Sequence, residues 1–246
     1  MRVALVPGSS RGLGSAIARR LARDGFSVAV NGLSDDSQAD SVAEEIRRDG
    51  GMAAAFLADV TSEAGVADLV DGVSSALGPV EVLVVNATGP QPEAPLEQVS
   101  WADHLDQLAF FVESPIRIGT AVLPGMRASG FGRIVHVDSE VVDVTPPGRS
   151  AYVTAKSAQL GLMRSWAREL APLGITVNSV APGFVPVERY SDVPAEIRSA
   201  YTASVPVGRM GLPEEIAHAV SFFASEASGF VTGQRLVVDG GRGLRG

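Results

Sequence analysis

The amino-acid sequence predicts an α/β fold built on a doubly wound sheet of seven mostly parallel strands, with helices on both faces. Seven short runs are almost continuously apolar and rich in Val, Leu and Ile, as expected for parallel strands buried on both faces. These runs alternate with longer stretches of helical periodicity, which is the pattern of doubly wound sheets. The runs cover residues 2–7, 26–31, 53–60, 80–87, 133–139, 175–182 and 235–241.

The length of the chain is typical of one domain over residues 1–246. A chain of 246 residues with 46% hydrophobic content can bury a large core. No repeat, low-complexity tract or linker interrupts the alternation. The one long irregular stretch covers about residues 184–212 and is rich in Pro, Val, Ser and Arg. In a compact domain, a loop of that length is more often a functional lid than a joint, so we expect a lid there.

Composition excludes several classes of protein. The chain contains no cysteine, which rules out disulfides, thiolate metal sites and cysteine nucleophiles. Its three histidines, His104, His136 and His218, are far apart and lack metal-ligand spacing, so we expect no metal site. A net charge of −8 argues against a nucleic-acid partner. No stretch is long and apolar enough for a membrane span or a signal peptide, so we expect a cytoplasmic protein without a membrane partner.

A glycine-rich turn follows the first predicted strand. Gly8, Gly12 and Gly14 lie where this strand ends and the first helix begins. Glycine allows a tight turn and a close approach to a ligand, and a helix N-terminus favours a pyrophosphate. The turn therefore predicts a dinucleotide site. Packing alone also produces such turns, and the spacing here differs from the common Gly-x-Gly-x2-Gly fingerprint.

Two further strand ends carry candidate binding residues. Asp59 and Val60 close the third predicted strand, and Asn86 and Ala87 close the fourth. In a doubly wound sheet, these carboxyl ends line the ligand crevice. Asp59 could accept a hydrogen bond from an adenine amino group, or it could cap the helix that begins near Ser62.

One lysine stands out among the basic residues. The chain has 20 Lys and Arg residues, and Lys156 is the only lysine among them. It follows Tyr152 by four positions, so on a helix the two side chains share a face. A phenol has a pKa of about 10, and a neighbouring ammonium lowers it. The pair therefore predicts an acid–base catalyst, with an incidental surface pair as the alternative.

Ser139 stands thirteen positions before Tyr152, at the end of the fifth predicted strand. Its hydroxyl would point into the same crevice and could donate to a substrate carbonyl. The surrounding residues lack the Gly-x-Ser-x-Gly elbow of a hydrolase nucleophile. We interpret Ser139 as an orienting donor, while a simple cap is the alternative.

Together these residues resemble the classical short-chain dehydrogenase/reductase family, in particular the group that includes 3-oxoacyl-carrier-protein reductases. The likeness extends from about residue 3 to residue 241 and keeps the family's order of motifs. It implies a Rossmann-type fold and hydride transfer between a nicotinamide cofactor and a carbonyl or alcohol. Tyr152 would be the acid–base residue, Ser139 would position the oxygen, and Lys156 would lower the pKa of the tyrosine and hold the ribose. The cofactor-binding residues that the resemblance implies are Gly8, Ser10, Arg11, Gly12, Leu13, Gly14, Asn31, Asp59, Val60, Asn86, Ala87, Tyr152, Lys156, Pro182, Gly183 and Val185.

The chain also departs from the family pattern. Leu108 occupies the place of an Asn that holds a water in the family's proton relay, so the relay must differ here. His104 and Gln107 are the nearby polar residues that could substitute for it. The other departures are Pro7, Val85, Thr88 and Val187.

Three polar residues alternate along the fifth predicted strand and its end. His136, Asp138 and Glu140 would share a face opposite to Ser139. Glu140 could reach the substrate or a neighbouring subunit. We expect solvated or helix-packing roles for all three, because polar residues at strand ends are common.

The end of the second predicted strand favours NADPH over NADH. NAD users normally place an acid there, whereas this chain has Asn31, Gly32 and Leu33. Arg11 could meet a 2′-phosphate, as arginines do in NADPH-using relatives. Asp35 and Asp36 keep NADH as the alternative.

The expected substrate is a small-molecule ketone, with β-ketoacyl and carrier-bound or polyketide-like compounds as candidates. Apolar lid residues predict a mostly apolar pocket, and Arg189 and Arg198 could attract an anionic group. These lid residues are Phe184, Val185, Val187, Tyr190 and Tyr201.

The sequence leaves three alternative functions open, and it also suggests an oligomeric state. The chain could work as an alcohol dehydrogenase in the oxidative direction, or bind a cofactor as a sensor or structural protein with little turnover. A dehydratase or epimerase is a smaller possibility. The resemblance implies a homotetramer, and the helix after Tyr152 carries more apolar area than one sheet face needs.

Overall fold

The computed structural model describes residues 1–34, 37–188 and 193–244. Its centre is a seven-stranded sheet in the order β3-β2-β1-β4-β5-β6-β7, and every neighbouring pair of strands in this sheet is parallel. The predicted doubly wound α/β fold is therefore confirmed. The strands are β1 Val3–Val6, β2 Ser27–Gly32, β3 Met52–Leu57, β4 Val80–Val85, β5 Gly132–Val137, β6 Ile175–Pro182 and β7 Arg235–Val238.

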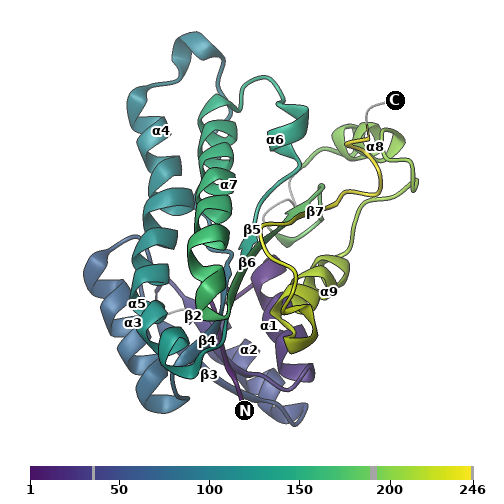
Figure 1. Cartoon of the computed structure of the whole chain (residues 1–246). Helices are drawn as coiled ribbons and strands as arrows, with labels where there is room; N and C mark the ends of the chain where they lie inside the picture. Colours follow the sequence, from purple (N-terminus) through teal and green to yellow (C-terminus); the bar gives the residue numbers. More distant parts are fainter. Residues whose placement is uncertain (35–36, 189–192, 245–246) are drawn as a thin grey trace.

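Helices cover both faces of the sheet (Figure 1). On one face, apolar side chains of the sheet pack against α1, α2 and α9, and on the other they pack against α3, α5 and α7. The α-helices are α1 Gly12–Arg23, α2 Ser37–Arg48, α3 Glu63–Ala76, α4 Trp101–Leu108, α5 Ser114–Ser129, α6 Val141–Val144, α7 Ser150–Leu170, α8 Ala195–Ala203 and α9 Pro213–Ala224. Short 3-10 turns cover Leu96–Gln98, Ala171–Leu173 and Glu226–Ser228.

Inner and edge strands of the sheet differ in how deeply they are buried. The inner strands β1, β2, β5 and β6 are buried at every position, because both of their faces are covered. The edge strands β3 and β7 keep exposed apolar side chains, such as Leu57 and Leu236. The apolar runs predicted the strands, but they did not distinguish inner strands from edges.

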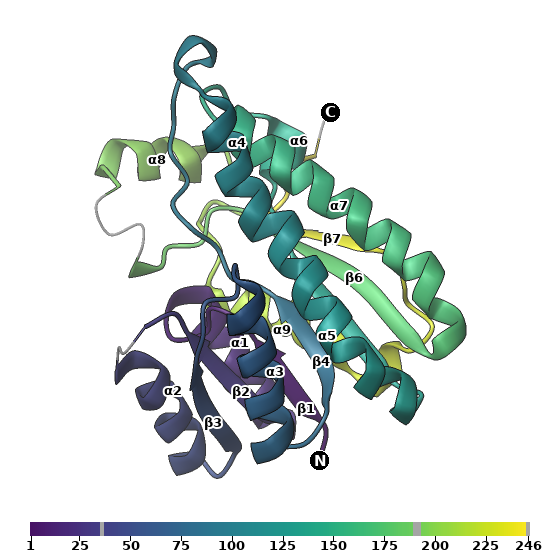
Figure 2. The ribbon, with the colours of Figure 1, turned by 90° about the vertical axis from the view of Figure 1, so that its left-hand side faces the viewer.

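The order of the strands places the topological switch point of the sheet between β1 and β4. The chain passes from β1 outwards to β2 and β3, and then returns to β4 on the other side of β1. At such a switch point, the loops at the carboxyl ends of the strands separate and leave a crevice. Figure 2 shows α4, α5 and α7 in front of the sheet, with α6 and the start of α7 near its upper end.

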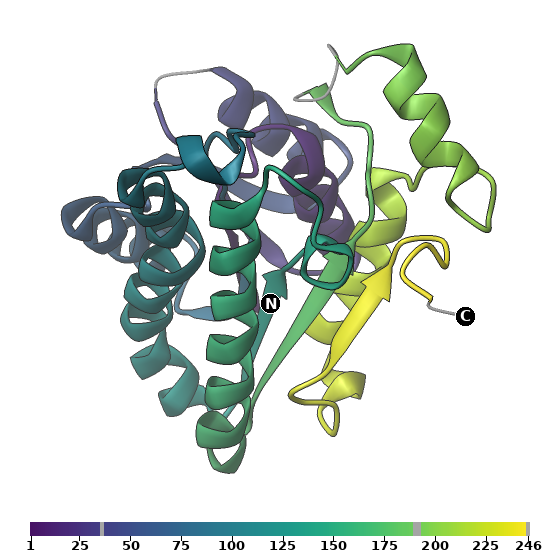
Figure 3. The same cartoon turned by 90° about the horizontal axis from the view of Figure 1, so that it is seen from above.

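The segment expected to be an irregular lid contains a helix. α8 lies at the carboxyl end of the sheet, over the region reached by the loop after β6 (Figure 3). α9 begins at Pro213, directly after the expected range of 184–212. That this stretch acts as a lid stays a prediction, and Arg189 and Tyr190 lie outside the described residues. No helix in the described ranges is long and apolar enough to cross a membrane.

Candidate active site

The glycine turn forms a tight loop between β1 and α1. Gly8 has φ +67° and Gly12 has φ +59°, a backbone region that favours glycine. Arg11 is the N-cap residue of α1 and makes no capping hydrogen bond with its side chain. No side chain of the N-cap residue therefore accepts a hydrogen bond from the first amides of α1, at the positive end of the helix dipole.

Asn86 fixes this loop from the neighbouring strand. Its Nδ2 atom donates to the carbonyls of Pro7, at 3.1 Å, and Gly8, at 3.0 Å. A Cβ atom at Gly14 would lie 2.3 Å from the Gly8 oxygen and 2.6 Å from Nδ2 of Asn86. Only glycine lets the helix approach the loop this closely. This cradle at the switch point fits the diphosphate of a dinucleotide.

Asn31 holds the same loop from β2. Its Oδ1 atom accepts from the Gly8 amide at 3.1 Å, and its Nδ2 atom donates to the carbonyls of Gly32, Phe56 and Ala58, at or next to the ends of β2 and β3. The side chain is only 2% exposed. Asn31 therefore shapes the glycine turn through hydrogen bonds within the protein.

Asp59 lies beyond the end of β3, on the rim of the crevice. Its Oδ1 atom accepts from the amide and hydroxyl of Thr61, at 2.9 and 2.6 Å. Ser62, not Asp59, caps α3 by accepting from the Gly65 amide. The capping alternative for Asp59 is therefore wrong, and its exposed carboxylate remains a candidate for the adenine contact.

The chain after β6 crosses back over the glycine loop. A Cβ atom at Gly12 would lie 3.4 Å from Oε2 of Glu188 and 3.7 Å from Cβ of Val187. Val185, two residues after Gly183, is buried in the core layer next to α1 and α9. The predicted residues Pro182, Gly183 and Val185 thus lie directly before the residues that approach the glycine turn.

Tyr152 and Lys156 lie one turn apart on α7, beside the carboxyl end of β5. The Nζ atom of Lys156 donates to the carbonyl of Val137 at 2.7 Å and lies 6.0 Å from the Tyr152 ring centroid. Lys156 is 4% exposed and Tyr152 is 9% exposed. The two residues are a buried pair, so the alternative of an incidental surface pair is wrong.

Ser139 follows β5 on the same side of the site. Its hydroxyl oxygen accepts from the Val141 amide at 3.3 Å, at the start of α6. A serine hydroxyl can accept and donate at once, so this contact leaves its proton for a substrate oxygen. The capping alternative and the orienting role are therefore compatible.

Burial governs the charges around Lys156. Removal of the ammonium from water lowers the pKa of Lys156 to about 8, against the opposing attraction of Asp138. Burial also raises the pKa of the Asp138 carboxyl, although Lys156 and Arg235 favour its charged form. The ammonium and this carboxylate therefore stabilise each other in a dry environment.

Arg235 of β7 clamps the segment that carries Ser139. Its Nε atom pairs with Asp138 at 2.5 Å and its Nη1 atom with Asp143 at 2.7 Å. Its Nη2 atom donates to the Ser139 carbonyl at 2.9 Å. The sequence reasoning missed this residue, because the contact joins positions almost a hundred residues apart.

Glu140 fastens the lid to the same segment. Its Oε1 atom accepts from Nη1 of Arg242 at 2.8 Å and from the Tyr201 hydroxyl at 3.1 Å. The Tyr201 oxygen in turn accepts from the Phe184 amide at 2.6 Å. This network joins α8, the chain after β6 and the C-terminal segment.

The expectation of solvated roles for the three polar residues on β5 and its end is wrong. His136, Asp138 and Glu140 are at most 6% exposed. Helix α7, Arg235 and the lid network cover them. His136 keeps the expected helix contact, because its ring lies 5.8 Å from that of Trp166 on α7.

The place of the family's relay asparagine is apolar and irregular. Leu108 ends α4, and a π-helical turn over Ala109–Glu113 follows before α5. Phe111 in this turn is 2% exposed, and its ring lies 5.4 Å from that of Tyr152. π-turns of this kind often occur at functional sites.

The two proposed substitutes for the relay residue make other contacts. The amide of Gln107 donates to the Pro90 carbonyl at 2.8 Å. His104 stacks on Trp101, with ring centroids 6.0 Å apart, and its Nδ1 atom contacts the Ser100 carbonyl. These contacts direct both side chains towards residues 90–101.

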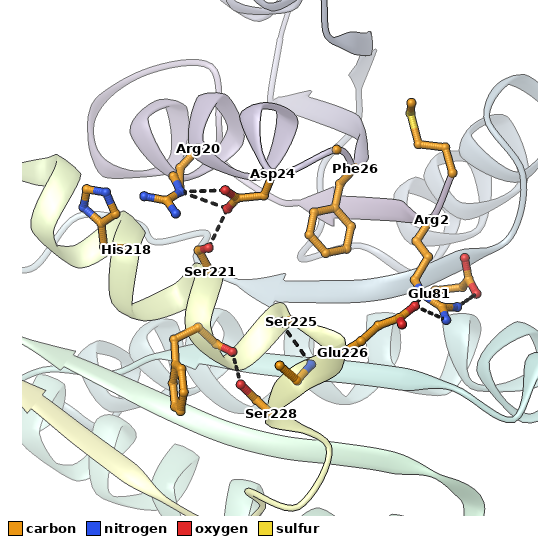
Figure 4. A pocket seen from close by; sticks show the side chains of 14 residues that line it. Arg2, Arg20, Asp24, Phe26, Glu81, His218, Ser221, Ser225, Glu226 and Ser228 are labelled. Atoms are coloured by element: carbon orange, nitrogen blue, oxygen red, sulfur yellow. Dashed lines mark hydrogen bonds and ion pairs between the residues drawn. The ribbon is translucent and has the colours of Figure 1, made fainter.

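A cavity of about 1010 Å³ lies at the opposite end of the sheet. Arg2, Phe26 and Glu81 line it from the amino ends of β1, β2 and β4 (Figure 4). Its charged groups pair with one another, as in the bridges of Arg2 with Glu81 and Glu226. This cavity is separate from the carboxyl ends that carry the candidate site. Within residues 1–34, 37–188 and 193–244, no cluster of His, Asp and Glu is arranged to hold a metal ion.

Comparisons with known proteins identify relatives along the whole chain. The family model described as enoyl-(acyl carrier protein) reductase matches residues 8–242. A cis-4-hydroxycyclohexanecarboxylate dehydrogenase of Sinomonas cyclohexanicum is 38% identical, over 98% of this chain and 96% of its own length. A 3-oxoacyl-[acyl-carrier-protein] reductase of Pseudomonas aeruginosa is 36% identical over the same shares. A gluconate 5-dehydrogenase of Burkholderia cenocepacia, solved with NADP and tartrate, is 32% identical with a TM-score of 0.91, and the match covers 98% of this chain and 94% of that one.

Proposed function

Because the chain belongs to the short-chain dehydrogenase/reductase family of NAD(P)-dependent oxidoreductases, we propose that it reduces a ketone to a secondary alcohol with NADPH. The observation that carries the proposal is the buried pair of Tyr152 and the only lysine, beside Ser139 at the end of β5. This arrangement can supply a proton at the crevice between the cofactor loop and the lid. We place the reaction in the cytoplasm and expect a homotetramer.

Each residue of the set has a distinct task in this reaction. The cofactor, when bound, supplies the hydride that adds to the carbonyl carbon. The Ser139 hydroxyl donates a hydrogen bond to the carbonyl oxygen and holds it near Tyr152. The phenol of Tyr152 transfers its proton to that oxygen as the C–H bond forms. The ammonium of Lys156 then stabilises the negative charge left on the tyrosine oxygen.

The relatives guide the choice of substrates. One acts on a hydroxycyclohexanecarboxylate and another on a 3-oxoacyl group bound to a carrier, and the chain resembles both to a similar degree. The proposed substrate is therefore a ketone on a ring or acyl chain that also carries a carboxylate or thioester. Oxidation of the matching alcohol is the second candidate, since the names of two relatives describe dehydrogenases.

A panel of ketones tests the proposed function. NADPH oxidation is followed with a 3-oxoacyl thioester, a 4-oxocyclohexanecarboxylate and a keto sugar acid, and the reverse reaction is followed with the matching alcohols and NADP⁺. We expect turnover with at least one ketone. Binding of NADPH without turnover of any ketone or alcohol would instead favour a sensor or structural protein that binds the cofactor.

Arg11 is the residue expected to select NADPH. It is exposed at the start of α1, beside the cofactor loop, and β2 ends in Asn31 and Gly32 without a carboxylate. Arg11→Ala should raise the KM for NADPH roughly tenfold, the loss of one charge-assisted contact to a phosphate, and leave the KM for NADH nearly unchanged.

Arg23→Ala provides the matched control for cofactor choice. Arg23 lies at the other end of α1 and pairs weakly with Asp49 at 3.8 Å. Both KM values should therefore stay at the wild-type level. Equal kcat/KM values for NADH and NADPH in the wild type would contradict the proposed preference.

A further inference from the structure

Lys156 has an unusual polar neighbour on its own helix. Its Nζ atom donates to Oε1 of Gln159 at 3.0 Å, in addition to the Val137 carbonyl. Gln159 is 1% exposed and lies one turn further along α7. Gln159 therefore provides the side-chain acceptor that the structure records for this ammonium.

The ammonium also has apolar neighbours. The Phe111 ring centroid lies 4.0 Å from Nζ, and Leu108, Phe110 and Val141 pack in the same cluster. Aromatic rings attract a cation, but they cannot accept a directed hydrogen bond as an amide oxygen does. The contacts that the structure gives Lys156 with the segment around Leu108 are therefore apolar, and its side-chain acceptor is Gln159 on α7.

Gln159 and two residues on the sheet face that α7 covers have buried polar atoms. All three side chains have polar atoms without a hydrogen-bond partner among the described residues: Nε2 of Gln159, both ring nitrogens of His136 and the Ser179 hydroxyl. His136 and Ser179 are paired in register on β5 and β6, so their side chains share the face that α7 covers. Buried groups of this kind are normally satisfied by ordered water, and these side chains offer enough donors and acceptors to hold it.

Gln159 on α7 and His136 on β5 are displaced in the same direction from Lys156 and Val137. Gln159 lies about 4.5 Å further along α7 than Lys156, and His136 lies about 3.3 Å before Val137 on β5. Because α7 runs antiparallel to β5, Gln159 and His136 both lie further from the carboxyl end of the sheet than Lys156 and Val137. Burial, together with the nearby charge of Lys156, lowers the pKa of His136 to about 3. This histidine is therefore neutral.

We infer that Gln159 is a positioning residue for the reaction, which holds the Lys156 ammonium against the Val137 carbonyl and links it to the buried polar groups of His136 and Ser179. The inference rests on the proposed function for its role in turnover. Gln159 touches neither substrate nor cofactor, and it acts through the place and charge of Lys156. Among the described residues, the other titratable groups that act on Lys156 are Tyr152 on α7, His136 on β5 and Asp138, which directly follows β5.

The single lysine allows a test that does not require activity. In protein labelled with [13Cε]lysine, Lys156 gives the one lysine signal, and its chemical shift reports the protonation of Nζ as pH changes. The wild-type signal should titrate near pH 8. Gln159→Met removes the acceptor and should lower the midpoint by about one unit, while Gln159→Glu adds a carboxylate and should raise it.

Steady-state kinetics with a ketone that the enzyme reduces complete the test. Gln159→Met should lower kcat about tenfold with a smaller change in the KM of the ketone, and Gln159→Glu should recover part of that loss near pH 8. Gln107→Met is the matched control, because Gln107 is also buried but donates to Pro90. Its lysine signal should titrate as in the wild type.

The outcomes separate this inference from the proposed function. If both Gln159 variants leave the lysine midpoint unchanged, or if Gln107→Met moves it instead, the inference is wrong. If the midpoints move in opposite directions but the wild type reduces no ketone, Gln159 holds Lys156 and the proposed function fails. Should Gln159→Met not fold, the rise of the midpoint in Gln159→Glu still decides the question.

Discussion

Tyr152→Phe should lower kcat for ketone reduction by about 10²–10⁴-fold, because it removes the group proposed to deliver the proton. The fold should not change, since a phenylalanine ring keeps the edge contact with Phe111 at the same place. NADPH affinity, measured by fluorescence titration, should stay within a few-fold of the wild type. The variant therefore separates chemistry from binding.

Tyr201→Phe is the control for the loss of a hydroxyl near the site. Tyr201 lies in α8, and its hydroxyl joins Glu140 to the Phe184 amide. Burial raises the pKa of Tyr201 to about 12, so it is a poor proton donor at neutral pH. Its loss should affect the KM of the ketone more than kcat. A Tyr152→Phe variant that keeps a tenth or more of the wild-type kcat would remove Tyr152 from the proposed chemistry.

Arg235→Met should destabilise the protein by roughly 3–5 kcal/mol, the cost of leaving a buried charge without its partner. The Asp138 side chain is 1% exposed and loses its ion pair, and the Ser139 carbonyl loses a donor. Urea unfolding monitored by Trp fluorescence measures the loss. Activity should fall as well, because Arg235 fixes the backbone that carries Ser139.

Two further variants show whether the buried charge is the cause. Arg19→Met breaks the half-exposed pair with Glu45 and should cost at most about 1 kcal/mol. Adding Asp138→Asn to Arg235→Met removes the stranded carboxylate and should recover part of the stability. If Arg235→Met costs no more than Arg19→Met, the clamp does not stabilise the site.

The apolar runs predicted the sheet well, because buried parallel strands are local and continuous in sequence. The glycine turn and the shared helix face of Tyr152 and Lys156 could also be predicted, because each depends on residues that are close together in the sequence. The lid helix α8 was missed, since its nine residues carry no buried side chain and lie between proline-rich segments. The π-turn at 109–113 has no Gly or Pro to mark it, and tertiary packing of Phe111 accompanies it.

Contacts between distant segments were beyond the reach of sequence patterns. Nothing near Asp138 predicts that Arg235 pairs with it, because the pairing depends on which strand follows β6 at the edge of the sheet. The lid network of Glu140, Tyr201 and Arg242 is of the same kind. By contrast, Gln159 lies three residues after Lys156 on one helix, and that spacing alone could have indicated the contact.

Transfer of a label from the cofactor tests the central claim most directly. The enzyme is incubated with a ketone from the panel and NADPH carrying deuterium at C4 of the nicotinamide ring, on the face from which hydride leaves, and the alcohol is analysed by mass spectrometry and NMR. The proposed reaction predicts one deuterium on the carbinol carbon and none elsewhere in the product. Alcohol without that deuterium, or loss of NADPH with no alcohol formed, would contradict direct hydride transfer at this site.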